Sequence, residues 1–168
     1  LVVPNPASSS PGMAFLTEDR RGEGLLMEFS LAENMILASI QRFANRLGLI
    51  DGPAAVAAAR AVGKQVHLST DRVTETLAKH LSGGNQQKVV IGKWLMRVPR
   101  LFILDEPTRG IDVGAKQEVY RIINELVENG SAVLLISSEI EELIGLSDRI
   151  LTINSGALTG SFERPAFN

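Results

Sequence analysis

The sequence contains no cysteine among its 168 residues, and this absence excludes disulfide bonds, thiolate metal sites and a cysteine nucleophile. Long hydrophobic runs are also lacking. Residues 132–136 form one of the longest, far short of the roughly 20 apolar residues that a membrane-spanning helix requires. The N-terminus also lacks the basic segment followed by an apolar segment that is typical of a secretory signal.

The sequence also has little net charge. Its 17 basic and 19 acidic residues give a formal net charge of −2 at pH 7. No broad positive surface therefore favours nucleic acid, and we expect no nucleic-acid partner. Apolar residues make up 45% and charged residues 21% of the chain, which is typical of a globular domain.

The beginning of the chain indicates a partial protein. The first residue is Leu1 and not methionine, so we expect the chain to be part of a longer polypeptide. Residues 1–12 contain three prolines and three consecutive serines, and they predict a linker. Residues 13–168 are then expected to form one partial domain.

Helical signals fill the middle of the chain. Ser30 and Glu33 have the spacing of a capping box, and the apolar residues that follow recur at helical intervals, which predicts a helix over residues 31–47. Further helices are predicted over residues 51–66 and 84–97.

The second half of the chain has the pattern of an α/β fold. Residues 101–104 and 132–136 are continuous apolar runs, which predict strands buried on both faces of a parallel sheet. A helix is predicted between them, over residues 114–128. The remaining predicted elements are a strand at 13–16, a short helix at 139–146 and a hairpin over 149–159.

Two carboxylates, Asp105 and Glu106, directly follow the first of these apolar runs. This position places them at the carboxyl edge of a parallel sheet, where ligands bind in open α/β folds. In a nucleotide hydrolase the first would serve a magnesium ion and the second would polarise the attacking water. An isolated Asp-Glu pair is more often a solvated acidic turn, so its context must decide.

Residues 81–88, LSGGNQQK, supply that context. Ser82, Gly83 and Gly84 at the start of a helix would offer a phosphate a hydroxyl group, unhindered backbone amides and a positive helix end. A Ser-Gly-Gly sequence by itself is more often only a loop. The combination with the Asp-Glu pair favours a phosphate site.

Residues 81–95, LSGGNQQKVVIGKWL, and residues 101–116, LFILDEPTRGIDVGAK, together resemble the ABC ATPases. More narrowly, the GNQQK and TRGIDVGAK runs resemble the second nucleotide-binding domain of the tandem ATPase subunits of bacterial ribose-, xylose- and galactose-type importers. The resemblance implies a partial P-loop NTPase core of parallel strands, with an inserted helical subdomain at about residues 30–97. The core proper would occupy about residues 100–160, without the N-terminal β part and the P-loop strand.

The resemblance also implies roles for individual residues. Ser82, Gly83 and Gly84, with Gln86 nearby, would contact the γ-phosphate of ATP bound to an opposite nucleotide-binding domain. Asp112 lies in the run that matches the D-loop, which crosses the dimer interface in this family.

The domain's own nucleotide site would use a second set of residues. Asp105 would serve Mg²⁺ through water, and Glu106 would serve the attacking water. Glu18 falls where most relatives have the Q-loop glutamine. Ser138 occupies the switch position, where active family members have histidine.

Two departures from the family pattern bear on activity. The hydroxyl group of Ser138 is shorter than an imidazole and uncharged, so it is a poor substitute at the γ-phosphate. No G-x-x-x-x-G-K-[ST] sequence occurs in the chain, so the β- and γ-phosphates of ATP have no cradle here. We therefore expect this chain alone to have no ATPase activity.

The resemblance implies partners and a location as well. The partners are a second ABC nucleotide-binding domain, membrane permease subunits and, indirectly, a sugar-binding protein. The location is the cytoplasmic face of the bacterial inner membrane, with the protein attached peripherally. Because strands are missing, apolar edges of the sheet would be open, and we expect this chain to dimerise or to exchange elements to cover them.

Two alternatives remain open. The chain could belong to a catalytically silent regulatory or interaction module, although the retained Glu106 argues against it. It could also belong to an ABC ATPase of DNA repair, which shares the Ser-Gly-Gly sequence and the Asp-Glu pair. Such proteins contain long heptad coiled coils, and this sequence sustains no heptad pattern.

Overall fold

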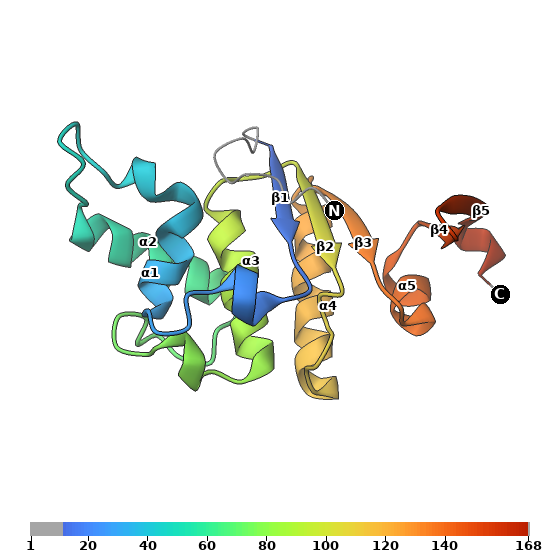
Figure 1. The fold of residues 1–168 in the computed structure, drawn as a ribbon, viewed down its shortest axis with the longest axis horizontal. Helices are drawn as coiled ribbons and strands as arrows, with labels where there is room; N and C mark the ends of the chain where they lie inside the picture. Colours follow the sequence, from blue (N-terminus) through green and yellow to red (C-terminus); the bar gives the residue numbers. More distant parts are fainter. Residues whose placement is uncertain (1–11, 168) are drawn as a thin grey trace.

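The computed structural model describes residues 12–167, in which a small parallel sheet lies between a block of helices and a terminal hairpin (Figure 1). In chain order the elements are β1 (Met13–Leu16), the π-helical turn η1 (Arg20–Gly24), α1 (Leu31–Ile36), the 3-10 helix η2 (Leu37–Arg42), α2 (Gly52–Gln65), the 3-10 turn η3 (Ala78–His80), α3 (Gly83–Leu95), β2 (Leu101–Asp105), α4 (Val113–Glu128), β3 (Ala132–Ile136), α5 (Ile140–Leu146), β4 (Arg149–Asn154), β5 (Ala157–Glu163) and the 3-10 turn η4 (Arg164–Ala166). Within residues 12–167, none of the helices has the length and apolar character needed to cross a membrane.

The three parallel strands are paired in the order β1-β2-β3. Met13 of β1 is in register with Leu101 of β2, which in turn is in register with Ala132 of β3. All three strands therefore end at the same edge of the sheet. This edge carries the residues that follow each strand, beginning at residues 17, 106 and 137.

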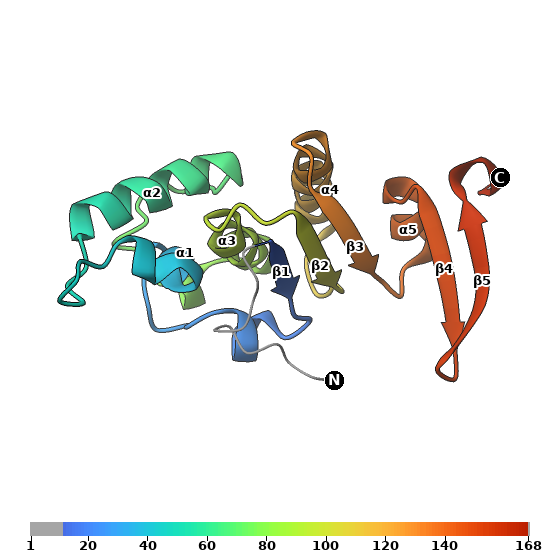
Figure 2. The ribbon, with the colours of Figure 1, turned by 90° about the horizontal axis from the view of Figure 1, so that it is seen from above.

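Within residues 12–167, helices cover one face of this sheet and leave the other without a covering helix. Figure 2 shows α3 and α4 on the same side of the strands, and the residues that point toward them are buried, among them Leu16, Phe102 and Leu104. The opposite face is open, with Leu134 49% and Ile136 45% exposed. The prediction of strands buried on both faces was therefore wrong, because the described residues supply a covering layer for one face alone.

The helical block is formed by α1, α2 and α3, which contact one another. The predicted capping box is confirmed: the Ser30 hydroxyl accepts from the Glu33 backbone N–H, and the Glu33 carboxylate accepts from the Ser30 backbone N–H. These bonds satisfy two N–H groups that the helix start would otherwise leave unpaired. The predicted helix over residues 51–66 is confirmed as α2, which is capped by the Asp51 carboxylate.

The predicted helix over residues 31–47 is shorter than expected. α1 ends at Ile36, and the following 3-10 segment has a non-helical residue at Ser39, with φ −132° and ψ 20°. Two of the apolar positions that suggested a longer helix do not reach the core, since Ile40 is 37% and Leu47 84% exposed, and Phe43 packs against the core but is only partly buried. Without burial of that face, the tertiary packing that stabilises most helices is missing.

The C-terminal part extends away from the sheet, at the opposite end of the molecule from the helical block (Figures 1 and 2). The predicted hairpin is confirmed as the antiparallel pair β4 and β5, which forms a sheet of its own. Several of its apolar side chains are exposed, including Ile153 at 72% and Leu158 at 62%.

Candidate functional site

The carboxyl edge of the parallel sheet brings together four of the predicted site residues. Glu18 follows β1, Asp105 and Glu106 lie at the end of β2, and Ser138 follows β3. The Glu106 Oε1 atom accepts a hydrogen bond of 2.8 Å from the Ser138 backbone N–H. The switch position and the candidate catalytic carboxylate are thus in direct contact, although they are 32 residues apart.

Glu106 has a strained backbone. Its φ is +46°, in the left-handed region that non-glycine residues seldom adopt. Its backbone N–H is bonded to the Ile136 carbonyl at 2.9 Å, which continues the pairing of β2 with β3 by one residue. The strained conformation turns the chain sharply out of the sheet and places the carboxylate beside the end of β3. Strain of this kind is often concentrated at functional sites.

The electrostatics of this edge favour a cation. Burial raises the pKa of Asp105, and the neighbouring carboxylates of Glu18 and Glu106 raise it further, because each disfavours another negative charge. The side chain of Arg109 forms a salt bridge with Glu18 and offsets part of this charge. A magnesium ion near Asp105 would offset more.

The residues present fit magnesium only together with a nucleotide. Among residues 12–167, no group of three or more His, Cys, Asp or Glu side chains is arranged to hold a metal. Mg²⁺ in nucleotide sites is commonly held by one or two carboxylates and by the phosphates themselves, and Asp105 fits such a role. The chain has no P-loop sequence, so it supplies no cradle for those phosphates.

The second predicted group is the Ser-Gly-Gly turn, residues 82–84, which begins α3. The Ser82 hydroxyl oxygen caps this helix by accepting from the backbone and side-chain N–H groups of Asn85, at 3.4 and 3.1 Å. A hydroxyl that accepts in this way keeps its hydrogen for donation. Ser82 is exposed, so its hydroxyl can donate to a ligand outside the chain.

The two glycines of this turn face protein neighbours. A Cβ atom added to Gly84 would lie 2.4 Å from the Cβ of Ala115 on α4, and one added to Gly83 would lie 3.1 Å from Cγ2 of Ile111. Bulk at Gly84 would therefore separate α3 from α4. The absence of a side chain there is explained by helix packing, and the prediction that glycine keeps a ligand path open does not account for it.

Gln86 lies inside the protein. Its side chain is fully buried, and its Nε2 donates to the carbonyls of Ala78 and Leu81 at 3.2 and 3.3 Å. Its Oε1 accepts from Nε of Arg21 at 3.3 Å. The assignment of Gln86 to nucleotide binding stays a prediction, and in this structure its amide holds the segment that leads into the Ser-Gly-Gly turn.

Asp112 lies beside the Ser-Gly-Gly turn. It caps α4 through an Oδ1 that accepts from the Ala115 backbone N–H at 2.9 Å. The loop after β2, residues 106–112, passes close to the turn, since an added Cβ at Gly83 would lie 3.2 Å from the Gly110 carbonyl oxygen. The structure therefore forms two groups connected by this loop: the carboxylates at the sheet edge, and a surface of Ser82, Gly83 and Asp112 in which Ser82 and Asp112 are exposed and Gly83 is half-buried.

Sequence reasoning missed two contacts of this loop. Arg20 donates to the carbonyls of Arg109 and Gly110, at 2.7 and 3.2 Å. On the other side, the buried Thr108 donates through its hydroxyl to Oε1 of Glu142 on α5, at 3.0 Å. In the sequence, these two contacts are signalled only by a charged segment at residues 18–21 and an acidic pair at residues 141–142. Neither pattern indicates which residues it contacts.

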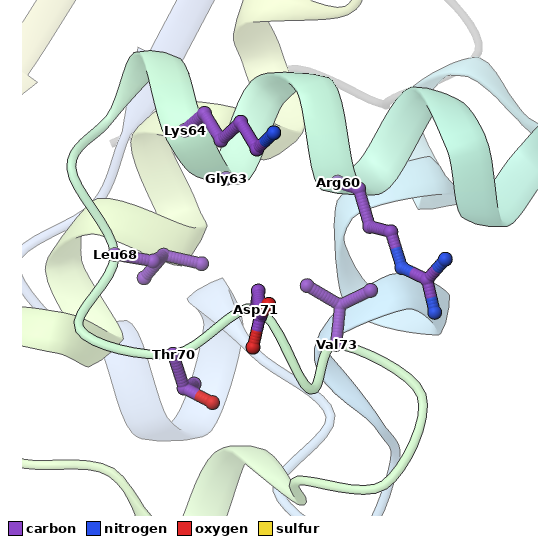
Figure 3. Close-up of a pocket in the computed structure, with 7 residues that line it drawn as sticks. All are labelled: Arg60, Gly63, Lys64, Leu68, Thr70, Asp71 and Val73. Carbon is purple, nitrogen blue, oxygen red and sulfur yellow. The ribbon is translucent and has the colours of Figure 1, made fainter.

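A small hollow lies elsewhere, on the helical block (Figure 3). It is formed between α2 and the segment that follows it, with Gly63, Leu68 and Val73 at its apolar wall and Arg60 and Lys64 on the α2 side. None of the predicted site residues lines it.

Comparison with known proteins agrees with this arrangement. The profile of the family described as "ABC transporter" matches residues 7–109, more than half of the chain. The chain belongs to the ABC transporter family. Its fold is that of the ABC-type P-loop NTPases, in partial form.

Curated relatives of this ABC chain cover nearly all of it. The ribose import ATP-binding protein RbsA 1 of Rubrobacter xylanophilus is 43% identical over 99% of the chain, and RbsA of Bacillus subtilis is 45% identical over 96%. The xylose import ATP-binding protein XylG of Geobacillus kaustophilus is 46% identical over 91%. The chain spans only about a third of the length of these relatives, 33%, 32% and 30% respectively.

Solved structures show the same fold. The ATP-binding cassette MJ0796, in a dimeric post-hydrolysis state bound to ADP and Pi, matches with a TM-score of 0.75 at 23% identity. The match covers 91% of this chain and 63% of that cassette. The ABC chain thus has most of the elements of a cassette, and over a third of the cassette has no counterpart in the match.

Proposed function

We propose that this chain is part of the ATP-binding subunit of a bacterial ABC importer for sugars of the ribose and xylose type. The observation that carries the proposal is the pairing of Glu106 with the Ser138 backbone at a sheet edge that also holds Asp105. The names of the relatives, which are ribose and xylose import ATP-binding proteins, support the sugar class. Within such a subunit we place the chain in the second of two nucleotide-binding domains.

In this proposal the surface of Ser82, Gly83 and Asp112 acts on ATP held by a second nucleotide-binding domain. Ser82 donates from its hydroxyl, and the start of α3 presents backbone N–H groups and the positive end of the helix dipole to the γ-phosphate. Gln86 supports the turn from inside the protein. The helical block, residues 30–97, contacts the membrane permease, and a sugar-binding protein acts through that permease. The subunit lies peripherally at the cytoplasmic face of the inner membrane.

The carboxylates form this domain's own site. When bound, Mg²⁺-ATP would supply the phosphoryl group, and its magnesium ion would offset the negative charge of Asp105. One oxygen of Glu106 is held by the Ser138 backbone N–H, and in this proposal the other accepts a hydrogen bond from a water. Ser138 offers no imidazole to a γ-phosphate, so we propose that hydrolysis in the complete subunit is stronger at the other site than at this one.

Replacing Glu106 by glutamine in the complete subunit tests this proposal. The substitution keeps the size of the side chain and removes the charge that polarises water, so we expect steady-state ATPase activity at this site to fall about a hundredfold. The ATPase activity of the whole subunit would fall only by the part that this site contributes. Single-turnover measurements with the other site inactivated would isolate that part. Glu128→Gln, at the exposed end of α4, is the matched control.

The retained Glu106 also separates this proposal from its main alternative. A catalytically silent module is favoured by the serine at position 138 and by the absence of a P-loop sequence. If Glu106→Gln leaves the single-turnover rate unchanged, the chain belongs to such a module. The isolated chain is expected to hydrolyse no ATP, and measurable turnover by it would contradict the assignment of the phosphate cradle to residues outside it.

A further inference from the structure

Arg20 bridges two segments that are distant in the sequence. It is the first residue of η1, and its guanidinium donates from Nη1 to the Arg109 carbonyl at 2.7 Å and from Nη2 to the Gly110 carbonyl at 3.2 Å. Two adjacent carbonyls of the loop after β2 are therefore held by one planar group. The neighbouring Arg109 side chain pairs with Glu18, which fixes the same loop a second time.

The same guanidinium lies beside the Ser-Gly-Gly turn. A Cβ atom added to Gly83 would lie 2.9 Å from Nη2 of Arg20, closer than real Cβ atoms approach other atoms. Gly83 is also the residue that approaches Ile111 and the Gly110 carbonyl. Arg20 thus occupies the space between the turn and the loop, and it touches both.

An arginine is suited to this position in a way that other residues are not. Its rigid fork donates in parallel to two acceptors, whereas lysine carries a compact charge on a flexible stem. The placement is costly, because Nε of Arg20 is buried without a hydrogen-bond partner among residues 12–167, and burial lowers the pKa of its guanidinium. A charged group held in this way contributes little net stability to the fold, because its desolvation offsets much of the free energy gained from its hydrogen bonds.

We propose that Arg20 is a positioning residue that holds the loop after β2 in register with the Ser-Gly-Gly turn. This inference rests on the proposed function, in which both segments contact one ATP held by another domain. The bridge fixes the distance between Ser82 and Asp112, so that both reach the nucleotide together. It also connects them to Glu18 and to the end of β1, so the two groups of site residues move as one.

Arg20→Lys and Arg20→Gln in the complete subunit test the proposal by two measurements. The first is hydrogen exchange of peptides from residues 106–112, which should become severalfold faster, while exchange in α4 stays at the wild-type rate. The second is steady-state kinetics, in which kcat should fall about tenfold or more while KM for ATP stays within about twofold, since misplacement affects the closed state and not nucleotide capture. A residue that only adds global stability would speed exchange throughout.

Arg149→Lys is the matched control, since Arg149 is an exposed arginine at the start of β4, and both readouts should match the wild type. Wild-type exchange in residues 106–112 in both Arg20 variants would overturn the proposal, and so would faster exchange with unchanged kcat. If Arg20→Gln does not fold, Arg20→Lys retains the charge and decides alone. If the wild-type subunit has no ATPase activity, the proposed function fails, while the exchange comparison still decides whether Arg20 orders the loop.

Discussion

Individual residues at the Ser-Gly-Gly turn serve packing, in addition to the phosphate contact that we propose for Ser82. Gly84 is buried at the contact between α3 and α4. Because it has no side chain, the backbone of α3 can pack closely against Ala115 of α4. Ser82 caps the same helix with the hydroxyl that we assign to a phosphate. A substitution at this turn therefore has a structural effect that must be measured before any functional effect is assigned.

Gly84→Ala should lower the free energy of unfolding by about 1–3 kcal/mol, because the added methyl group overlaps Ala115. Chemical denaturation of the chain would measure the change. Adding Ala115→Gly removes the overlapping atom. The double variant should therefore be more stable than the sum of the two single effects predicts, by about 1 kcal/mol or more in the free energy of unfolding. Gly145→Ala on α5, where an added Cβ meets nothing within 4 Å, should instead stabilise by up to about 1 kcal/mol.

At the scale of elements, α1 is short and is tied to the segment before it by a buried asparagine. Asn34 is fully buried in it, and its Oδ1 accepts from the Leu26 backbone N–H at 2.8 Å. Its Nδ2 donates to the carbonyls of Leu26 and Ser30 at 2.9 and 3.0 Å. One side chain thus attaches the segment before α1 to the helix, which lets a six-residue helix begin the block.

Asn34→Asp should destabilise the chain by about 2–3 kcal/mol, because it places a carboxylate oxygen against two carbonyl oxygens in a buried position. Asn124→Asp makes the same chemical change on the exposed side of α4 and should alter stability by no more than about 0.5 kcal/mol. Urea denaturation at pH 7 compares the two. Equal effects would show that the Asn34 contacts contribute nothing specific.

At the scale of the whole molecule, the unusual feature is the apolar surface that no described element covers. It includes the open face of the three-stranded sheet, with Met13, Leu134 and Ile136 exposed, and α5 adds exposed apolar residues such as Ile140 at 58%. Large exposed apolar surfaces favour association.

The isolated chain is therefore expected to dimerise or to exchange elements with a second copy. Light scattering over a range of concentrations would measure the mass. Leu134→Lys, on the open face, should shift the equilibrium toward monomer, while Leu49→Lys, on an exposed loop of the helical block, should leave it unchanged. A monodisperse monomer for the unaltered chain at all concentrations would contradict the prediction.

Local sequence signals determined much of this protein. The capping box at Ser30 and Glu33, the apolar runs of β2 and β3 and the cap at Ser82 act within a few residues, so their physics is present in the sequence itself. The placement of Asp105 and Glu106 at a sheet edge followed from the strand before them. The length of α1 did not follow, because periodicity cannot tell whether an apolar face finds a partner.

Tertiary structure alone decided which side chains meet. Gln86 turns inward, Arg20 reaches carbonyls 89 and 90 residues away, and one face of the sheet stays open. Each outcome depends on how separate elements pack, and a buried polar group takes whichever partner that packing brings within reach. The sequence thus determined the elements and the chemistry available at their ends, and packing determined how that chemistry is held in place.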